Sequence, residues 1–285
     1  MAAFRGWLSA AHPFPLTLVL ALTALIGVAS ADGKPDAGWL ALALVGMALS
    51  QLAIGWSNDY LDRETDAIHQ PWKPLPAGLV EARRVPLAVG VVLAGSLAAG
   101  APLGLTPLLL LIAGTVCGLA YNLGLKDTRL SALPFVVALA LLPAFVWTAL
   151  DVYRHDFLLL YAIGSPLALA AHIANALPDI ETDAAAGRRG LAVVLGRRWS
   201  LALIEACMLA PLVVFSTTLP GREYDVKLPG TQSFLIVWVV MAYVVFGLFI
   251  AYRYASDSSR EADVWGFRLV GLASVLLAVG WLASF

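Results

Sequence analysis

The chain contains 285 residues, of which 60% are hydrophobic and only 13% are charged. A soluble domain has about 45–50% apolar and about 25% charged residues, so this composition excludes an ordinary soluble protein and predicts an integral membrane protein. The formal net charge is −1, and we expect membrane lipid but no nucleic acid as a partner. The two cysteines lie in separate apolar runs, which favours small core residues over a disulfide or a zinc site.

Apolar runs separated by charged or Gly/Pro-rich breaks predict an all-α protein with nine membrane-spanning helices. We expect one domain over residues 1–285, in which the first run is a retained span and not a signal peptide. The third and fourth runs should form a hairpin, because Pro102 and Pro107 interrupt them. The nine predicted spans cover residues 15–31, 39–57, 84–101, 105–123, 132–150, 157–177, 200–219, 233–252 and 265–283.

The lysines and arginines set the orientation of these helices in the membrane. With the N-terminus in the cytoplasm, 18 basic residues divide so that all but Lys34, Arg154, Arg222 and Lys227 fall in cytoplasmic segments. This asymmetry predicts a cytoplasmic N-terminus and an external C-terminus. The Ala- and Arg-rich composition also suggests the inner membrane of a bacterium.

An acidic segment, residues 58–66, lies at the end of the second predicted span. Asn58, Asp62 and Asp66 are four residues apart, and Asp59 follows Asn58 directly. Since an α-helix turns by about 100° per residue, these four polar side chains share one stripe of the helix. The segment therefore predicts a row of oxygen ligands at one end of a span.

A second acidic segment, residues 175–183, lies at the end of the sixth predicted span. Asn175, Asp179 and Asp183 repeat the same Asn-x₃-Asp-x₃-Asp spacing. The orientation places both segments on the cytoplasmic side. The repeat suggests a pseudo-symmetric bundle in which two acidic walls face each other.

Clustered carboxylates near the hydrocarbon region repel one another and are costly without a cation. No Cys or His is interleaved with them at ligand spacing, and hard oxygen ligands favour Mg²⁺. A charged loop that ends a helix in water is the alternative for either segment alone. Two matched segments favour a magnesium site, with ligands from Asp59, Asp62, Asp66, Asp179 and Asp183.

Basic and polar residues follow both acidic segments. Lys73 lies in a rigid Pro-rich loop after the first segment. The others are Tyr121, Asn122 and Lys126 at the end of the fourth span, and Arg188 and Arg189 after the second segment. Carboxylates with basic loops beside them suit metal ions and a bound diphosphate. Ordinary cytoplasmic positive charge is the alternative, and on that ground no role is assigned to Arg83, Arg84, Arg197, Arg198 and Arg260.

Four histidines remain. His172 lies on the same helix stripe as Asn175, one turn deeper in the membrane. It either contacts a substrate or packs as a hydrogen-bonded core residue. His69 is expected in a solvated loop, and His12 and His155 at the membrane interface.

These motifs resemble those of the UbiA superfamily of intramembrane prenyltransferases. The resemblance covers residues 50–200 and rests on the two acidic segments, the Pro-Leu-Pro-Ala-Gly loop at 74–78, and Tyr121 with Lys126. It implies a nine-helix bundle around a central cavity with a cytoplasmic cap. It further implies that the aspartates bind Mg²⁺ and an isoprenoid diphosphate, while Arg188 or Arg189 and the two lysines hold the diphosphate.

The resemblance also implies the chemistry, in which Asp62, Asp66, Asp179, Asp183 and Lys126 are catalytic. The metal and the lysines neutralise the diphosphate as it leaves, and an apolar cavity protects the allylic cation from water. A lipophilic or aromatic acceptor, of quinone type, then attacks the cation. Two alternatives stay open: a terpene cyclase of the same superfamily, and a cation-coupled transporter, whose carboxylates should lie nearer the bilayer midplane.

Overall fold

The computed structural model describes residues 2–218, 243–244, 246–247, 250 and 259–282, which form helices and loops without a β-strand. The predicted span at 233–252 lies largely outside the described residues, as do Arg222 and Lys227. Within the described part, six helical segments are long and apolar enough to cross a membrane. They are Pro13–Ser30, Ala37–His69, Ala82–Leu103, Leu105–Asn122, Ala132–Leu150 and Phe157–Ala185. These six match the first six predicted spans, and the all-helical fold is confirmed.

The described residues fold into two compact units. The first contains Met1–Lys126 and Leu141–Val152, and the second contains Asp127–Ala140 and Tyr153–Phe285. Helix α6 (Ala132–Leu150) contributes its first turns to the second unit and the rest to the first unit. Each unit holds one of the two acidic segments.

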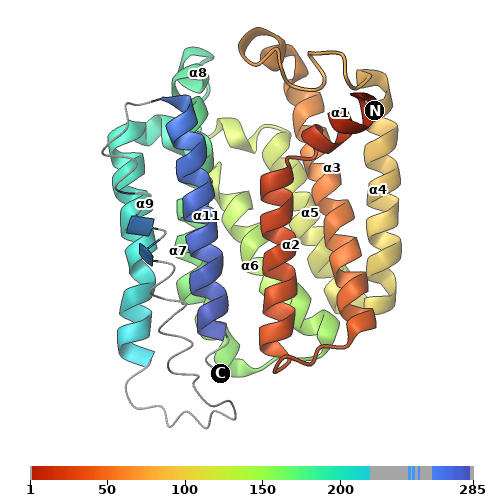
Figure 1. Cartoon of the computed structure of the whole chain (residues 1–285), viewed down its shortest axis with the longest axis vertical. Coiled ribbons are helices and arrows are strands. Elements are labelled where there is room, and N and C mark those ends of the chain that lie inside the picture. Colours follow the sequence, from red (N-terminus) through yellow and green to blue (C-terminus); the bar gives the residue numbers. More distant parts are fainter. Residues whose placement is uncertain (1, 219–242, 245, 248–249, 251–258, 283–285) are drawn as a thin grey trace. The chain divides into compact units, whose positions relative to one another are not determined.

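The first unit is built around one long helix, α3 (Ala37–His69). Helices α2 (Pro13–Ser30), α4 (Val85–Gly100) and α5 (Leu105–Asn122) pack against it (Figure 1). A short helix, α1 (Ala2–Ala10), packs near the end of α3 that carries the first acidic segment.

The length of α3 explains how an acidic segment ends an apolar span. At about 1.5 Å per residue its 33 residues extend about 50 Å, whereas the hydrocarbon core is about 30 Å thick. Asp36 caps the N-terminus by accepting a hydrogen bond from the Trp39 N–H at 2.9 Å. The C-terminal turns, which carry Asn58 to Asp66, therefore extend beyond the apolar part of the helix. The predicted helical stripe at this end is confirmed.

Small and polar residues join the helices of the first unit, as is typical of helix packing in lipid. Ser96 on α4 donates a hydrogen bond to the carbonyl oxygen of Gly46 at 2.8 Å, and the Ser50 and Thr115 hydroxyls lie 2.7 Å apart. The predicted hairpin between α4 and α5 is present, with Gly104 at φ 105°. A side chain is strained at such an angle, which explains the glycine there.

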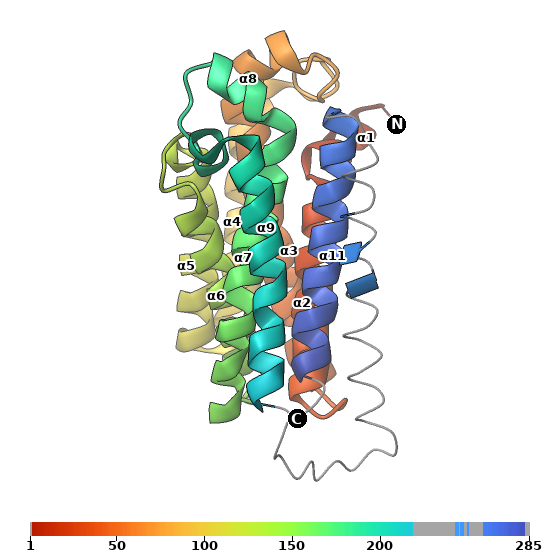
Figure 2. The same ribbon diagram turned by 90° about the vertical axis from the view of Figure 1, so that its left-hand side faces the viewer.

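In the second unit, α7 (Leu160–Ala176) packs against both α9 (Leu191–Thr218) and α11 (Arg260–Leu282) (Figure 2). Arg197 on α9 forms two hydrogen bonds, of 2.9 and 2.7 Å, with Asp263 on α11, whose side chain is buried. This bidentate pair ties the two helices together. It gives Arg197 a structural partner away from the acidic segment.

The second acidic segment is not one regular α-helix, which corrects the prediction of a continuous stripe. Helix α7 ends at Ala176, a 3₁₀ turn follows over Leu177–Asp179, and α8 covers Ile180–Ala185. Pro178 has no N–H group and crowds the preceding turn, so the backbone tightens there. Asp179 ends the tight turn and Asp183 lies on α8, so the two carboxylates are supported by different elements.

Candidate active site

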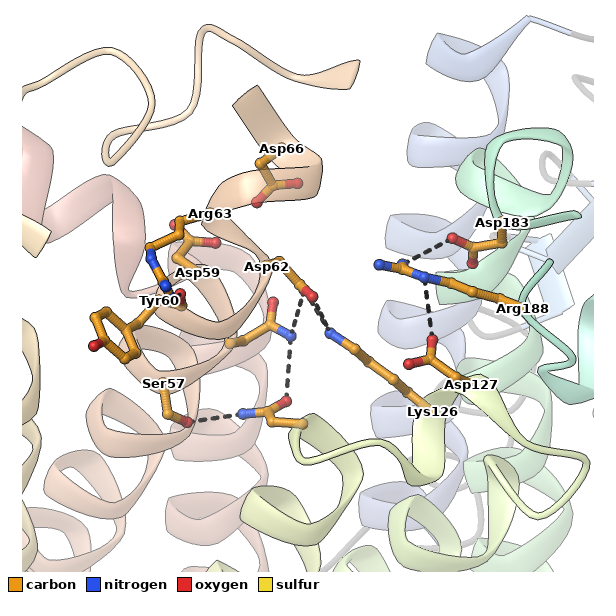
Figure 3. Close-up of polar contacts among 12 residues, drawn as sticks. Ser57, Asp59, Tyr60, Asp62, Arg63, Asp66, Lys126, Asp127, Asp183 and Arg188 are labelled. Atoms are coloured by element: carbon orange, nitrogen blue, oxygen red, sulfur yellow. Dashed lines mark hydrogen bonds and ion pairs between the residues drawn. The ribbon is translucent and has the colours of Figure 1, made fainter. Parts of the chain in front are cut away.

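Three carboxylates and two lysines meet at the end of α3 in the first unit, and we call Asp59, Asp62, Asp66, Lys73 and Lys126 the first cluster. Figure 3 shows the three carboxylates and Lys126. Lys73 donates a hydrogen bond to Asp66 at 2.9 Å and lies 3.6 Å from Asp59. Lys126, in the short turn Leu125–Asp127 after α5, lies 2.5 Å from both carboxylate oxygens of Asp62. The sequence predicted all five residues for the site, and the structure brings them together.

Burial and charge act in opposite directions on Lys73. Burial alone would lower the pKa of its ammonium group. The hydrogen bond to Asp66 and the charges of Asp59, Asp66 and Asp62 outweigh that effect, so the pKa of Lys73 is raised above its ordinary value. Lys73 therefore stays positively charged at neutral pH.

Asn122, the last residue of α5, forms hydrogen bonds with three residues of α3 next to the first cluster. Its amide nitrogen donates to the Ile54 carbonyl oxygen at 2.8 Å and to the Ser57 hydroxyl at 2.9 Å. Its amide oxygen accepts from Asn58, which also donates to Asp62, both at 3.2 Å. Asn122 is buried, so the structure gives this predicted substrate-binding residue a supporting position beneath Asp62.

We expect Asn122→Ala to lower both stability and activity. The substitution removes three hydrogen bonds made by a buried amide, each of which contributes about 0.5–1.5 kcal/mol to stability. Thermal unfolding of the purified protein and initial rates should both report the change. Ser57→Ala removes one of these contacts and should have a smaller effect; an Asn122→Ala protein with wild-type stability and rate would contradict the supporting role.

The second cluster lies in the second unit and consists of Asp179 and Asp183 with their arginine partners. Arg260, the first residue of α11, donates to Asp179 at 3.0 Å. Arg188 donates to Asp183 at 3.0 Å and lies 3.3 Å from Asp127 (Figure 3). Both carboxylates are half-buried, and a guanidinium group lies against each.

The remaining predicted residues differ in their placement. The Arg189 side chain is exposed, and its backbone N–H donates a hydrogen bond to the Asp127 carbonyl oxygen at 2.9 Å. The structure thus brings Arg188, not Arg189, to Asp183. His172 is buried and lies 3.1 Å from the Ser131 hydroxyl, which favours the packed core histidine of the two alternatives. Asn175 and Tyr121 are half-buried in the last turns of α7 and α5.

Three residues that contact the clusters are not predicted from the sequence: His12, Asp127 and Arg260. His12 lies 3.0 Å from Asp59 although 47 positions separate them. The charge pattern assigns Arg260 to ordinary cytoplasmic positive charge, whereas its partner Asp179 is 81 positions away. Asp127 had one signal in the sequence, since it directly follows Lys126. The other two contacts arise from tertiary packing alone.

The donor chemistry of both clusters fits Mg²⁺. In the part of the chain that the structure describes, no three acidic, histidine or cysteine side chains are arranged to hold a metal ion by themselves. Mg²⁺ does not require such a group, because it commonly binds one or two carboxylates and completes its coordination with water and phosphate oxygens. Asp62 with Asp66, and Asp179 with Asp183, supply carboxylates of this kind.

The chain matches the model of the UbiA prenyltransferase family over residues 18–282. A family match of this extent, on a helical membrane fold with both acidic segments, defines an integral membrane enzyme. The chain belongs to the UbiA prenyltransferase family.

Individual relatives align with this chain over nearly its whole length. The digeranylgeranylglyceryl phosphate synthase of Natronomonas pharaonis is 26% identical, covering 99% of both chains. That of Methanothermobacter thermautotrophicus is 29% identical, covering 95% of this chain and 93% of its own. A UbiA homologue from Archaeoglobus fulgidus, solved with DMAPP and Mg²⁺, has the same fold, with a TM-score of 0.72 at 18% identity over 98% of this chain and 99% of its own. These relatives are archaeal and lend no support to a bacterial membrane.

Proposed function

We propose that this protein is a Mg²⁺-dependent intramembrane prenyltransferase that ionises an isoprenoid diphosphate and transfers the prenyl group to a lipophilic acceptor. One observation carries the proposal. Asp62, Asp66, Asp179 and Asp183 each hold a lysine or arginine side chain. Each cluster thus combines carboxylates suited to a metal with cations suited to a diphosphate.

Within this proposal the cations exchange partners when substrate binds. Asp62 with Asp66, and Asp179 with Asp183, would hold Mg²⁺, which when bound would neutralise charge on the diphosphate. Lys126 and Lys73, released from Asp62 and Asp66, would then donate hydrogen bonds to diphosphate oxygens. Arg188 and Arg260 would do the same from the second cluster.

The reaction follows from that arrangement. The bond between the prenyl carbon and the diphosphate oxygen breaks, and both electrons stay on the diphosphate, where the lysines and arginines stabilise them. The apolar helices keep water away from the allylic cation. The acceptor contributes an electron pair to the new bond and releases one proton.

Two acceptor classes fit this chemistry. The sequence suggested an aromatic, quinone-type acceptor. The names of the archaeal relatives suggest a prenylated glyceryl phosphate, whose hydroxyl group would be the nucleophile. Transfer to the glyceryl phosphate hydroxyl is the version we favour, because relatives with this name align over nearly all of the chain.

We also propose the domain organisation of the protein, its number of membrane spans and its orientation in the membrane. One family model spans residues 18–282, which supports a single membrane domain made of both units. We propose nine membrane-spanning helices, with the N-terminus and the cap over the site on the cytoplasmic side. The charge asymmetry of the loops supports this orientation.

Product analysis tests the proposal. Purified protein with Mg²⁺ and geranylgeranyl diphosphate should release diphosphate and prenylate one acceptor in equal amounts, and chelation of the metal should stop both. The assay includes a glyceryl phosphate ether, an aromatic acceptor and no acceptor in parallel. A cyclised terpene formed without acceptor would identify the cyclase alternative, and no diphosphate release under any condition would reject an enzyme of this class.

A further inference from the structure

We propose that His12 is a positioning residue of the diphosphate site: it holds Asp59 so that Lys73 is free to turn to the substrate. The proposal rests on the proposed function. It gives a role to the N-terminal segment and assigns Asp59 to support of the site. Asp62, Asp66, Asp179 and Asp183 remain the carboxylates for the metal.

Asp59 lies between two cationic or polar partners. Its side chain is only 3% exposed. One carboxylate oxygen lies 3.0 Å from His12 Nε2 and 3.6 Å from Lys73 Nζ. Lys73 also holds Asp66, at 2.9 Å. Asp59 therefore shares Lys73 with a second carboxylate, while its contact with His12 is the shorter of the two.

This geometry matters when substrate arrives. If Lys73 turns to a diphosphate oxygen, it leaves Asp59, and a buried carboxylate without a hydrogen-bonding partner is costly. His12 remains as a donor to Asp59 in that state. It thereby lowers the cost of releasing Lys73, which should appear as tighter binding of the diphosphate.

The backbone fixes His12 in this position. His12 has φ 49° and ψ 70°, a left-handed conformation that a few residue types, His among them, adopt more readily than others. It joins α1 to Pro13, the first residue of α2. The buried junction residues Ala10 and Ala11 pack directly on Gly55, where an added Cβ would lie 3.2 Å from both of their carbonyl oxygens. Gly55 is one helical turn before Asp59.

Helix α1 also contacts the loop that carries Lys73. An added Cβ at Gly6 would lie 2.9 Å from Leu79 Cβ, so α1 and this loop are in close contact. The carbonyl oxygen of Trp7 accepts a hydrogen bond from Trp56 on α3 at 3.1 Å, and the two indole rings lie 4.8 Å apart. The N-terminal segment therefore joins α3, Asp59 and the Lys73 loop within one unit.

A matched pair of substitutions tests the proposal. His12→Leu cannot donate to Asp59, whereas His12→Gln has a similar reach and can donate. Neither leucine nor glutamine is branched at Cβ, so both substitutions put a similar steric demand on the left-handed backbone of residue 12. The difference in binding affinity between the two variants therefore reports the hydrogen bond to Asp59. Binding of an unreactive thio analogue of geranyl diphosphate with Mg²⁺ is measured by calorimetry on the full-length protein, with His155→Leu as a control at an exposed histidine.

We expect His12→Leu to weaken binding about tenfold or more and to raise KM with a smaller change in kcat, whereas His12→Gln keeps most of the affinity. In an Asp59→Asn background, His12→Leu should have little further effect, because the buried charge is gone. Wild-type affinity in His12→Leu, or the same loss in both backgrounds, would overturn the proposal. Failure of the wild-type protein to bind the analogue would instead overturn the proposed function.

Discussion

Asp62→Asn should reduce turnover by about a hundred- to a thousandfold or more while the protein still folds and inserts. Asparagine has nearly the same shape and keeps an oxygen for Asn58, which donates to Asp62 at 3.2 Å. It removes the charge that holds Lys126 and that would bind the metal. The initial rate of diphosphate release at saturating Mg²⁺ measures the effect.

Asp36→Asn provides the matched control on the same helix. Asp36 caps the other end of α3, where Asn is an equally good cap, so stability and rate should both stay near wild type. A comparable loss of rate in both variants would indicate a general effect of charge on α3. Wild-type activity in Asp62→Asn would remove the basis for the first cluster.

Asp179→Asn is expected to cause a loss of turnover of similar size in the second unit. The substitution removes a carboxylate for the metal and releases Arg260, which donates to Asp179 at 3.0 Å. Arg260→Ala, by contrast, keeps the carboxylate but removes its arginine partner and the proposed diphosphate contact, and it should chiefly raise KM. The rate should therefore depend on the Mg²⁺ concentration differently in the two variants. Asp179→Asn should change this dependence, and Arg260→Ala should leave it near that of the wild type.

Glu181→Gln is the control for Asp179→Asn, because Glu181 is an exposed carboxylate on α8, two positions away. Its rate should equal that of the wild type. Equal losses in Glu181→Gln and Asp179→Asn would show that the whole acidic segment, and not one carboxylate, matters. An active Asp179→Asn enzyme would exclude the second cluster from the chemistry.

Hydropathy predicted the first six spans because membrane helices require long apolar segments, and periodicity placed Asn58, Asp62 and Asp66 on one stripe of α3. The second stripe was less regular than predicted. Pro178 replaces a turn of α-helix by a 3₁₀ turn, and spacing alone does not show how far such a turn rotates the following residues.

The pairing of charges could not be predicted in the same way. Lys73 and Arg188 are close in sequence to their carboxylates, and the local motifs indicated both as candidates, although they did not separate Arg188 from Arg189. His12 and Arg260 reach theirs through the docking of α1 and the start of α11, at separations of 47 and 81 positions. The positive-inside rule assigns cytoplasmic arginines to membrane orientation, so it does not indicate the contact between Arg260 and Asp179.

Binding of the unreactive thio analogue with Mg²⁺ to the wild type, Asp62→Asn and Asp179→Asn tests the central claim most directly. If both clusters are needed to bind the diphosphate, calorimetry should show one analogue per wild-type chain. Each substitution should then weaken binding by at least about tenfold, as should removal of Mg²⁺. Wild-type affinity in either variant, or binding that does not depend on the metal, would contradict the claim.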